Sequence, residues 1–339
     1  MLTTKVKSIK MDILNIEPKQ YSFKAKEILC KIGNYFEVEK YSKKKYDNVE
    51  ILITRLAYNI NNDFIQNFPN LKIIATPTTG LNHINLNKKN KSKISIISLK
   101  GEYKFLSSIS STAELHWGLL ISLIRKIPQA NSHVLENNWN RDKFYATQLK
   151  GKTIGIIGYG RLGKMIAKFS KCFGLKTLIY DKNKDSVNKN IKFTELENLF
   201  YQSDIISINL SLDCNSKFLI NKKLLSRVKQ DVYLINTARG EVIDEFALCE
   251  EIKKGTIKGY ATDVLCDEIH KDSKFPKNNP LVKLAKQGAN IIFTPHIGGA
   301  CSDVMRNTEV FIAKKITNYI KIQEKNRKNE KKSLCSPYC

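Results

Sequence analysis

The chain has 339 residues and carries 57 Lys and Arg against 32 Asp and Glu, a formal net charge of +25. Its hydrophobic content of 42% is typical of a folded chain and argues against disorder throughout, and its length suggests two domains. The 8 cysteines form no CxxC pair and are too sparse for a disulfide scaffold. Neither structural disulfides nor a metal site is therefore expected.

The excess positive charge is diffuse, because it consists of Lys more than Arg and is spread along the whole chain. Such a pattern indicates a solvated basic surface rather than a patch that binds nucleic acid. The apolar runs are far shorter than the ~20 residues that a bilayer requires, and the Lys-rich start lacks the apolar core of a signal peptide. We expect a cytoplasmic protein with no nucleic-acid or membrane partner.

Strand-like and helix-like segments alternate in the first half of the chain. Apolar runs typical of strands occur at 11–16, 36–41, 50–55 and 71–76, and a helix is expected at 23–32. The apolar segment 112–127 predicts a buried helix that Pro128 ends. This alternation indicates a parallel sheet with crossover helices.

The second half repeats the alternation with strands that are almost continuously apolar. Strands are expected at 153–158, 177–180, 204–210, 232–236, 258–264 and 290–294, with helices at 195–200 and 244–254. Strands of this kind are buried on both faces, as in a parallel sheet covered by helices on both sides. From Lys321 onward the chain is highly charged and predicts a disordered tail.

A glycine-rich turn, Gly158-Tyr159-Gly160-Arg161-Leu162-Gly163, separates an apolar strand from an amphipathic helix. Gly158 allows the tight turn, Gly160 lets backbone N–H groups approach a pyrophosphate, and Gly163 lets the helix pack closely on the strand. The helix N-terminus then faces the phosphates. The next strand ends in Asp181, at about the 20-residue offset of a carboxylate that binds ribose hydroxyls and repels a 2′-phosphate. The motif predicts NAD rather than NADP.

Further strand ends carry polar residues typical of a ligand site. Arg239 follows one buried strand and His296 follows another. Because the carboxyl ends of parallel strands meet at one edge of the sheet, we expect both residues to lie on the same edge as the glycine turn. Acidic residues lie at the end of a third strand, and their spacing alone does not show which of them is functionally important: Asp263, Asp267 and Glu268.

In this order and spacing, the glycine turn and the runs 236–240, 263–268 and 294–299 resemble the D-isomer-specific 2-hydroxyacid dehydrogenase family. The resemblance covers roughly residues 71–308. It implies an α/β fold in which a Rossmann-type doubly wound parallel sheet is inserted into a flavodoxin-like α/β substrate domain. The implied division is an NAD-binding domain at 111–295, a discontinuous substrate domain at 11–110 and 296–320, and tails at 1–10 and 321–339.

The resemblance also implies roles for individual residues. Arg239 would bind the substrate carboxylate and polarise the carbonyl, His296 would be the general acid/base, and Glu268 would hold His296 through a hydrogen bond. Thr79 and Gly80 match a loop whose backbone N–H groups grip the carboxylate. The positions that match the family's cofactor contacts are Gly158, Gly160, Arg161, Leu162, Gly163, Asp181, Thr237, Ala238, Asp263, His296, Gly298 and Gly299.

These residue types suit hydride transfer between NAD and a D-2-hydroxy acid. A histidine titrates near neutrality and can accept or return the hydroxyl proton, and the planar fork of an arginine matches a carboxylate. The family further implies a homodimer through the nucleotide domains, with the apolar helix at 117–127 near the contact.

The chain departs from the family pattern in ways that bear on the substrate. Arg55 matches a substrate-binding position that phosphoglycerate enzymes use for the phosphate, but Ala57 stands where a second arginine is expected. Asn209 and Ser211 replace a His and a Pro that often contact the cofactor. The stretch 98–107 is longer than usual and is interpreted as a substrate-facing loop, which favours a larger, sugar-derived hydroxy acid.

A second hypothesis is a catalytically weak, NAD(H)-sensing binding protein of the corepressor type, which occurs in the same superfamily. The complete set of Arg239, Glu268 and His296 favours the enzyme, since a sensor has no need of an acid/base.

Overall fold

The computed structural model describes residues 11–183, 193–266, 268 and 278–334, which fall into two compact units. Residues 11–102 and 302–334 lie in unit 1, and the intervening described residues from 103 to 301 lie in unit 2. The second unit is therefore inserted into the first along the sequence. The predicted tail at 1–10 and the end of the tail at 335–339 lie outside the described residues, as does Asp267.

Unit 1 is an α/β unit around a five-stranded parallel sheet in the order β2-β1-β3-β5-β7. Numbered along the chain within this sheet, the order is 2-1-3-4-5, which is the order of flavodoxin-like folds. The elements of unit 1 are β1 (Met11–Asn15), α1 (Phe23–Ile32), β2 (Gly33–Glu37), β3 (Val49–Ile53), β4 (Ile60–Asn61), α2 (Asn62–Ile65), β5 (Ile73–Ala75), β6 (Ile84–Asn85), α3 (Lys88–Lys93), β7 (Ser95–Ile97) and α12 (Ser302–Leu334).

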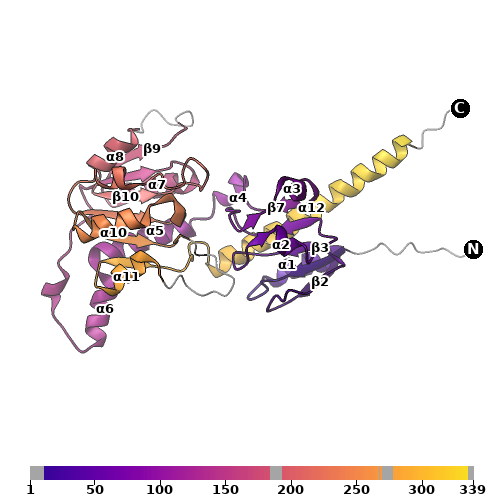
Figure 1. Cartoon of the computed structure of the whole chain (residues 1–339), viewed down its shortest axis with the longest axis horizontal. Coiled ribbons are helices and arrows are strands. Elements are labelled where there is room, and N and C mark those ends of the chain that lie inside the picture. The colour runs from indigo at the N-terminus through magenta and orange to yellow at the C-terminus, as the bar shows by residue number, and fades with distance from the viewer. Residues whose placement is uncertain (1–10, 184–192, 267, 269–277, 335–339) are drawn as a thin grey trace, which may run out of the picture. The chain divides into compact units, whose positions relative to one another are not determined.

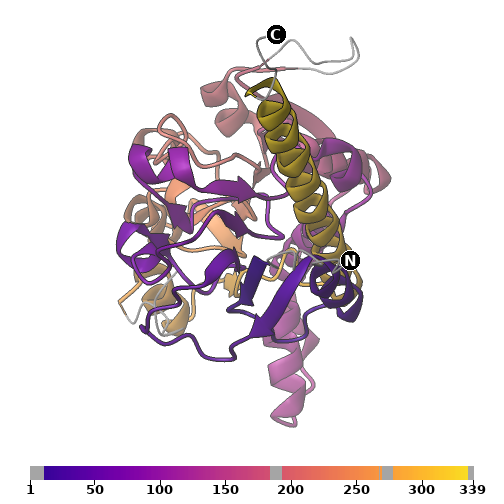
Figure 2. The same cartoon turned by 90° about the vertical axis from the view of Figure 1, so that its right-hand side faces the viewer.

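The last helix is much longer than the sequence suggested. α12 continues to Leu334 as one straight helix (Figure 1, Figure 2), so the prediction of a disordered tail from Lys321 is wrong up to that residue. Ile312, Ile316 and Ile320 recur at four-residue spacing and are buried, which fixes the first part of the helix. The Lys, Glu, Gln and Arg residues beyond them are strong helix formers and continue it.

Two expectations for the first half of the chain need correction. β2 begins at Gly33, directly after α1, rather than at 36 as predicted. A glycine is required there, because a Cβ would lie 2.3 Å from the carbonyl oxygen of Met11 on the neighbouring strand. The stretch 98–107, expected to be a loop, contains the short helix α4 (Tyr103–Leu106), whose Leu106 is buried.

Unit 2 is built around a six-stranded parallel sheet in the order β13-β12-β11-β10-β8-β9. The order reverses between β8 and β10, which is the topological switch point where doubly wound sheets bind ligands. Besides α4, its elements are α5 (Ser111–Arg125), α6 (Ile127–Leu135), η1 (Arg141–Phe144), β8 (Thr153–Ile157), α7 (Arg161–Cys172), β9 (Lys176–Tyr180), α8 (Leu196–Gln202), β10 (Ile205–Ile208), α9 (Lys222–Leu225), β11 (Val232–Asn236), η2 (Gly240–Val242), α10 (Glu245–Lys253), β12 (Ile257–Thr262), α11 (Pro280–Lys286) and β13 (Ile291–Phe293).

Apolar cores lie on both faces of this sheet. Ile156 points into the core that α5 and α7 cover, and Ile157 points into the core on the face of α8 to α11. Ile205 and Ile206 alternate in the same way. This two-sided burial explains why the strands read as continuous apolar runs.

The helix expected at 112–127 divides into α5 and α6 at Lys126, whose φ of 52° turns the chain. Pro128 lies in the first turn of α6, so it begins a helix rather than ending one. Trp117 is buried against the sheet, whereas α6 projects away from the unit (Figure 1, Figure 2). Within the described part of the chain, no helix is long and apolar enough to cross a membrane.

Candidate active site

The six strands of the unit 2 sheet all end at the same level, at a row of residues that pair from strand to strand. Tyr180 pairs with Ile157, Ile157 with Ile208, and the row continues through three more strands. The residues that directly follow this row are Asp181, Gly158, Asn209, Thr237, Asp263 and Thr294. The register thus brings the predicted cofactor and acid/base positions of unit 2 to the carboxyl edge of a single sheet.

The glycine turn has the geometry that its sequence predicts. Gly158 has φ of +91°, and a Cβ on it would lie 2.7 Å from the carbonyl oxygen of Asn209 on the neighbouring strand end. At Gly163 a Cβ would lie 2.0 Å from the carbonyl oxygen of Gly158, so only glycine lets α7 lie this close to β8. These two glycines set the turn and the packing of α7 on β8.

The third glycine leaves open space in front of a helix N-terminus. A Cβ on Gly160 would meet no described atom within 4 Å, and α7 begins at the next residue. Nearby strand ends carry two buried oxygens that lack a hydrogen-bond partner among the described residues, Thr237 Oγ1 and Asn209 Oδ1. Space, helix N–H groups and unsatisfied polar atoms at the switch point fit a dinucleotide with its pyrophosphate on α7.

Asp181 closes the other side of the glycine turn. Its Oδ2 accepts the backbone N–H of Tyr159 at 2.5 Å, and its Oδ1 accepts that of Asn183 at 2.8 Å. The carboxylate is therefore held against the turn from the end of β9. A carboxylate in this place can accept the hydroxyls of an adenosine ribose and disfavours a 2′-phosphate.

Three further predicted cofactor contacts lie beside these residues, with their side chains engaged in the protein. Arg161 Nη1 donates to the carbonyl oxygens of Ile109 at 2.7 Å and of Leu106 at 3.3 Å, and burial lowers the pKa of its guanidinium. Leu162 packs against the core. Ala238 is buried, and its backbone N–H donates to Asn236 Oδ1. Nη1 of Arg161 thus binds the chain before α5, while the backbone of this residue begins α7.

His296 and Glu268 form a direct pair. His296 Nδ1 and Glu268 Oε1 are 2.5 Å apart, and both side chains are about one quarter exposed. The backbone of His296 is left-handed, with φ of 54°, which is uncommon for a residue with a side chain. Because the carboxylate binds Nδ1, the other ring nitrogen, Nε2, is the one available to a substrate.

Asp263 holds the loop that carries His296. Its Oδ1 accepts the hydroxyl of Thr294 at 2.6 Å and the N–H of Ile297 at 2.8 Å, and its Oδ2 accepts the N–H of Gly298 at 2.8 Å. Burial raises the pKa of the Asp263 carboxyl, and these hydrogen bonds oppose the rise. Of the three acids that spacing left open, Glu268 pairs with His296, Asp263 supports the loop, and Asp267 lies outside the described residues.

Arg239 lies in the same group of side chains. Burial lowers the pKa of its guanidinium, while Glu268, Glu241 and Asp263 are close enough to raise it. Its Nη1 donates to the carbonyl oxygen of Ala238 at 2.6 Å. A half-buried cation beside the His296–Glu268 pair can attract an anionic substrate to the acid/base.

The predicted carboxylate loop belongs to unit 1. Thr79 and Gly80 follow the end of β5, with Thr79 exposed. The hydroxyl of Thr78 donates to the carbonyl oxygen of Gly80 at 2.9 Å and lies 3.0 Å from that of Thr76. These bonds fix the turn and leave the side chain of Thr79 at the surface.

Arg55, in the same unit, is held inside the protein. Its Nη2 forms an ion pair with Glu309 of α12, and its Nη1 donates to the carbonyl oxygen of Lys19 at 3.0 Å. The carboxylate of Glu17 accepts the backbone N–H groups of Arg55 at 2.5 Å and of Ala57 at 3.0 Å. The guanidinium is thus already paired with a carboxylate inside unit 1.

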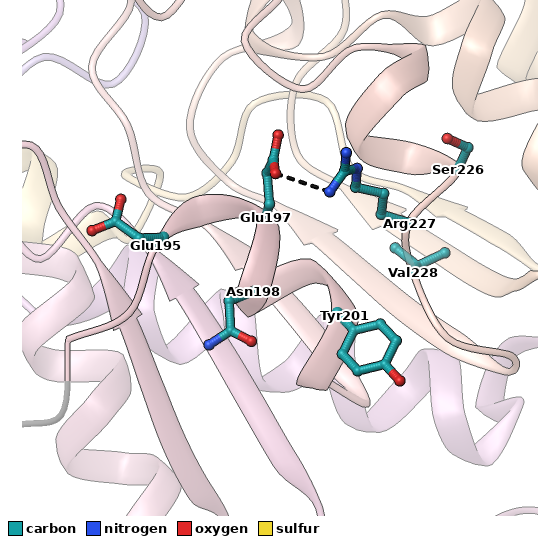
Figure 3. A pocket seen from close by; sticks show the side chains of 7 residues that line it. All are labelled: Glu195, Glu197, Asn198, Tyr201, Ser226, Arg227 and Val228. Carbon is teal, nitrogen blue, oxygen red and sulfur yellow. Dashed lines mark hydrogen bonds and ion pairs between the residues drawn. The ribbon is translucent and has the colours of Figure 1, made fainter.

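One pocket lies away from this edge, beside α8 (Figure 3). Within it, Glu197 pairs with Arg227 at 2.9 Å. None of the predicted site residues lines this pocket, and the arrangement of its side chains suggests no chemistry. It is lined by Glu195, Glu197, Asn198, Tyr201, Ser226, Arg227 and Val228.

Sequence reasoning missed the supporting hydroxyls. Thr294 donates to Asp263, and Thr112 of α5 donates to the carbonyl oxygen of Gly298 at 3.0 Å, so both sides of the His296 loop are anchored. The position of Thr294, two residues before His296, could have indicated that it supports this loop. Nothing local marks Thr112, which lies far from the loop in sequence.

A glycine turn that can seat a pyrophosphate, a strand-end carboxylate for the ribose, and a histidine paired with a carboxylate beside an arginine define an NAD-dependent oxidoreductase. The family model for the NAD-binding domain of D-isomer-specific 2-hydroxyacid dehydrogenases matches residues 117–298. The chain belongs to the D-isomer-specific 2-hydroxyacid dehydrogenase family.

Known proteins of this family resemble the chain over most of its length. It is 32% identical to a hydroxypyruvate reductase of Thermotoga maritima, covering 79% of this chain and 84% of that protein. It is also 32% identical to a glyoxylate reductase of Thermofilum pendens, with 80% and 78% covered. The crystal structure of an Aquifex aeolicus D-lactate dehydrogenase with NAD and lactic acid matches with a TM-score of 0.78 and 25% identity, over 94% and 98% of the two chains.

The predicted family, the α/β fold class, NAD as cofactor and the dehydrogenase activity are thereby confirmed. The comparisons favour the enzyme over the corepressor-type alternative. The roles of the individual site residues remain predictions, which the geometry now makes specific.

Proposed function

We propose that the chain interconverts a D-2-hydroxy acid and its 2-oxo acid through His296, paired with Glu268, and Arg239. The hydrogen bond between His296 Nδ1 and Glu268 Oε1, at 2.5 Å, carries this assignment. It fixes the ring so that Nε2 can exchange a proton, and the carboxylate stabilises the imidazolium that forms when the hydroxyl proton arrives. Unit 2 would bind NAD and unit 1 would supply substrate contacts.

In the oxidation, the C2–H bond breaks with its electron pair while the hydroxyl proton moves to His296 Nε2. NAD, when bound, supplies the acceptor for that hydride and, in reverse, its donor. In the reduction, His296 returns the proton to the carbonyl oxygen of the substrate. After the oxidation His296 releases this proton to water, and before the reduction it takes one up from water, so atoms and charge balance and the residues of the chain are unchanged after a full turnover.

Arg239 has two functions in this proposal. Its planar guanidinium binds the substrate carboxylate in a fixed orientation, and its charge polarises the carbonyl at the neighbouring carbon. The neighbouring carboxylates of Glu268, Glu241 and Asp263 help to keep Arg239 charged despite its burial. The turn at Thr79 and Gly80, which Thr78 stabilises, is the proposed source of backbone N–H groups for the same carboxylate.

A substrate without a phosphate group fits the environment of Arg55 better than phosphoglycerate does. The guanidinium is already paired with Glu309, and Ala57 contributes only its backbone N–H, which Glu17 accepts. The relatives include reductases named for hydroxypyruvate and glyoxylate, both small 2-oxo acids. A larger, sugar-derived acid is a further candidate substrate to test beside these.

The direct test is NADH consumption by the purified chain over a panel of 2-oxo acids: glyoxylate, pyruvate, hydroxypyruvate and longer sugar-derived acids. The variant Glu268→Gln should lose most of the turnover of the best substrate. Glu250→Gln, which alters an exposed glutamate paired with Lys222, should retain it. A wild-type chain that binds NADH and turns over no acid in the panel would refute the proposal and favour the sensor.

The assembly is part of the same proposal. α5, which is expected near a dimer contact, packs into the core of unit 2 through Trp117 and its neighbours, and α6 follows it directly in the chain. Exposed apolar side chains lie on and after α6: Ile127, Val134, Leu135, Trp139 and Tyr145. They support a homodimer through this helix of the NAD-binding unit. We also propose that the protein is cytoplasmic, because of the composition of the chain.

A further inference from the structure

A buried carboxylate outside the proposed mechanism lies behind the acid/base pair. Glu245 is the first residue of α10, after Asp244, which caps the helix through hydrogen bonds from the N–H groups of Phe246 and Ala247. Glu245 is only 6% exposed, and burial raises the pKa of its carboxyl. Acids at a helix start are usually solvated, so its burial requires partners inside the protein.

Both oxygens of Glu245 have such partners. Oε1 accepts the backbone N–H of Cys266 at 2.9 Å, and Oε2 accepts the side-chain amide of Asn279 at 2.7 Å. Asn279 itself caps α11 by accepting the N–H groups of Leu281 and Val282. Glu245 thus joins the starts of α10 and α11 to the turn that follows β12.

That turn carries Glu268. The N–H of Leu265 donates to Glu268 Oε2 at 3.1 Å, and the adjacent N–H of Cys266 donates to Glu245. Two successive peptide groups therefore bind two carboxylates, one of which pairs with His296 through its other oxygen. Displacing the Cys266 amide would displace the Leu265 amide and, with it, the carboxylate of Glu268.

The same turn is packed against the residue that follows Arg239. A Cβ on Gly240 would lie 2.0 Å from the carbonyl carbon of Leu265 and 2.2 Å from the nitrogen of Cys266. The Leu265–Cys266 peptide therefore lies directly on Gly240. The N–H of the same peptide donates to Glu245, so the peptide contacts both Glu245 and the residue that follows Arg239.

We propose that Glu245 is a positioning residue that fixes the Leu265–Cys266 peptide and so keeps Glu268 on His296, an inference that rests on the proposed function. Glu245 acts only through its hydrogen bonds to Cys266 and Asn279 and does not exchange protons with the substrate. Its removal should misplace the acid/base pair without altering the glycine turn.

Kinetics of matched variants test this. Glu245→Ala removes both hydrogen bonds and should lower kcat by roughly 10- to 100-fold, the effect of a displacement of about 1 Å at a reacting group. Glu245→Gln keeps an acceptor oxygen for the Cys266 N–H and should recover most of kcat. The Kd for NADH, measured by quenching of Trp fluorescence, should stay at the wild-type value in both variants.

The matched control is Glu251→Ala on the same helix. Glu251 is 3% exposed and pairs with Lys254 at 2.7 Å, so its removal also leaves a buried site without its carboxylate. Its kcat should stay within about twofold of the wild type when all variants are measured well below their Tm. An equal loss of kcat in Glu251→Ala and Glu245→Ala would overturn the positioning role.

A double-mutant cycle with Glu268→Gln separates an indirect effect from an independent one. If Glu245 acts through Glu268, adding Glu245→Ala to Glu268→Gln should lower kcat very little further. An additive loss of kcat in the double variant would contradict the inference.

A readout without turnover distinguishes this inference from the proposed function. The Nδ1 proton that His296 shares with Glu268 should give a far-downfield proton NMR signal, identified by its absence in His296→Gln. Glu245→Ala should abolish or weaken that signal, and Glu251→Ala should not. Retention of the signal in Glu245→Ala would refute the inference even if the chain proves active, and its loss would support the inference even if no substrate is found.

Discussion

The carbonyl oxygen of Asp263 accepts the backbone N–H of His296 at 2.9 Å, which joins the ends of β12 and β13. The carboxylate of the same aspartate binds the residues on both sides of His296, from Thr294 to Gly298. One residue thus holds the loop by its main chain and its side chain. The left-handed backbone of His296 persists because these bonds determine it.

Replacing this carboxylate should loosen the loop. Asp263→Asn removes the charge and one acceptor oxygen and leaves an N–H of the loop facing an amide donor, so we expect the free energy of unfolding to fall by about 2 kcal/mol. Chemical denaturation measures this, and kcat should fall with it. Asp244→Asn is the control, because asparagine caps a helix as well as aspartate does. Equal stability of the two variants would count against this role of Asp263.

Two glycines of the turn should respond differently to alanine. Gly163→Ala introduces a Cβ 2.0 Å from a backbone oxygen and should lower Tm, because α7 must move off β8. Gly160→Ala meets no described atom within 4 Å and should leave Tm of the free protein unchanged while weakening NADH binding. Thermal melts with and without NADH check both. Wild-type NADH affinity in Gly160→Ala would show that the pyrophosphate does not lie on this residue.

The sequence predicted the parts of the site that depend on local pattern. The glycine turn, the strands of unit 2 and the positions of Arg239 and His296 at strand ends all follow from apolar runs interrupted at fixed places. Spacing alone did not identify the acid partner of His296, because Asp263 and Glu268 lie in one short stretch, and only the family resemblance pointed to Glu268. The fold after β12 directs Glu268 toward Nδ1 and Asp263 toward the backbone of the loop.

Other features could not be predicted from the local sequence, because they depend on residues that are distant along the chain. Glu309 pairs with Arg55 across more than 250 positions, and no spacing rule connects them. Gly33 begins a strand because Met11 lies beside it in the sheet. The charged end of α12 has the polarity of a disordered tail, but its Lys, Glu, Gln and Arg residues have a high helix propensity.

Arg55 should behave as a structural residue when it is changed. Glu309 is almost fully buried, so Arg55→Met leaves a carboxylate without its cation and should destabilise the protein by about 3–5 kcal/mol. The KM for non-phosphorylated 2-oxo acids should change little at temperatures where the variant is folded. The double variant Arg55→Met, Glu309→Leu should recover much of the stability, because the unpaired charge is gone. A large rise in KM with unchanged stability would instead return Arg55 to the substrate site.

His116 should make stability depend on pH. It lies buried on α5 with Nε2 2.8 Å from the hydroxyl of Ser207, and burial lowers its pKa to about 3. The unfolded chain takes up this proton near pH 6.5 and the folded chain does not, so the contribution is complete above pH 6.5 and is lost as pH falls toward 3. Between pH 7.5 and 5 the loss amounts to about 2 kcal/mol.

The variant His116→Gln isolates that contribution, because glutamine does not titrate. Urea unfolding at pH 7.5 and 5 should show a smaller fall in stability for the variant than for the wild type. Carboxylates that titrate in both proteins cancel in this difference. An identical fall in the two proteins would mean that His116 is protonated in the folded state.

The exposed apolar surface on and after α6 should determine the assembly. Leu135 is 75% exposed and Trp139 is 90% exposed, which is unusual for side chains of this size on a lone chain. Sedimentation of the wild type should give the mass of two chains at micromolar concentration, and Leu135→Asp with Trp139→Ser should give the mass of one. Phe246→Ser alters a similarly exposed aromatic residue on α10 and should remain dimeric. A monomeric wild type would refute the proposed homodimer, and a dimeric Leu135→Asp, Trp139→Ser variant would place its interface elsewhere.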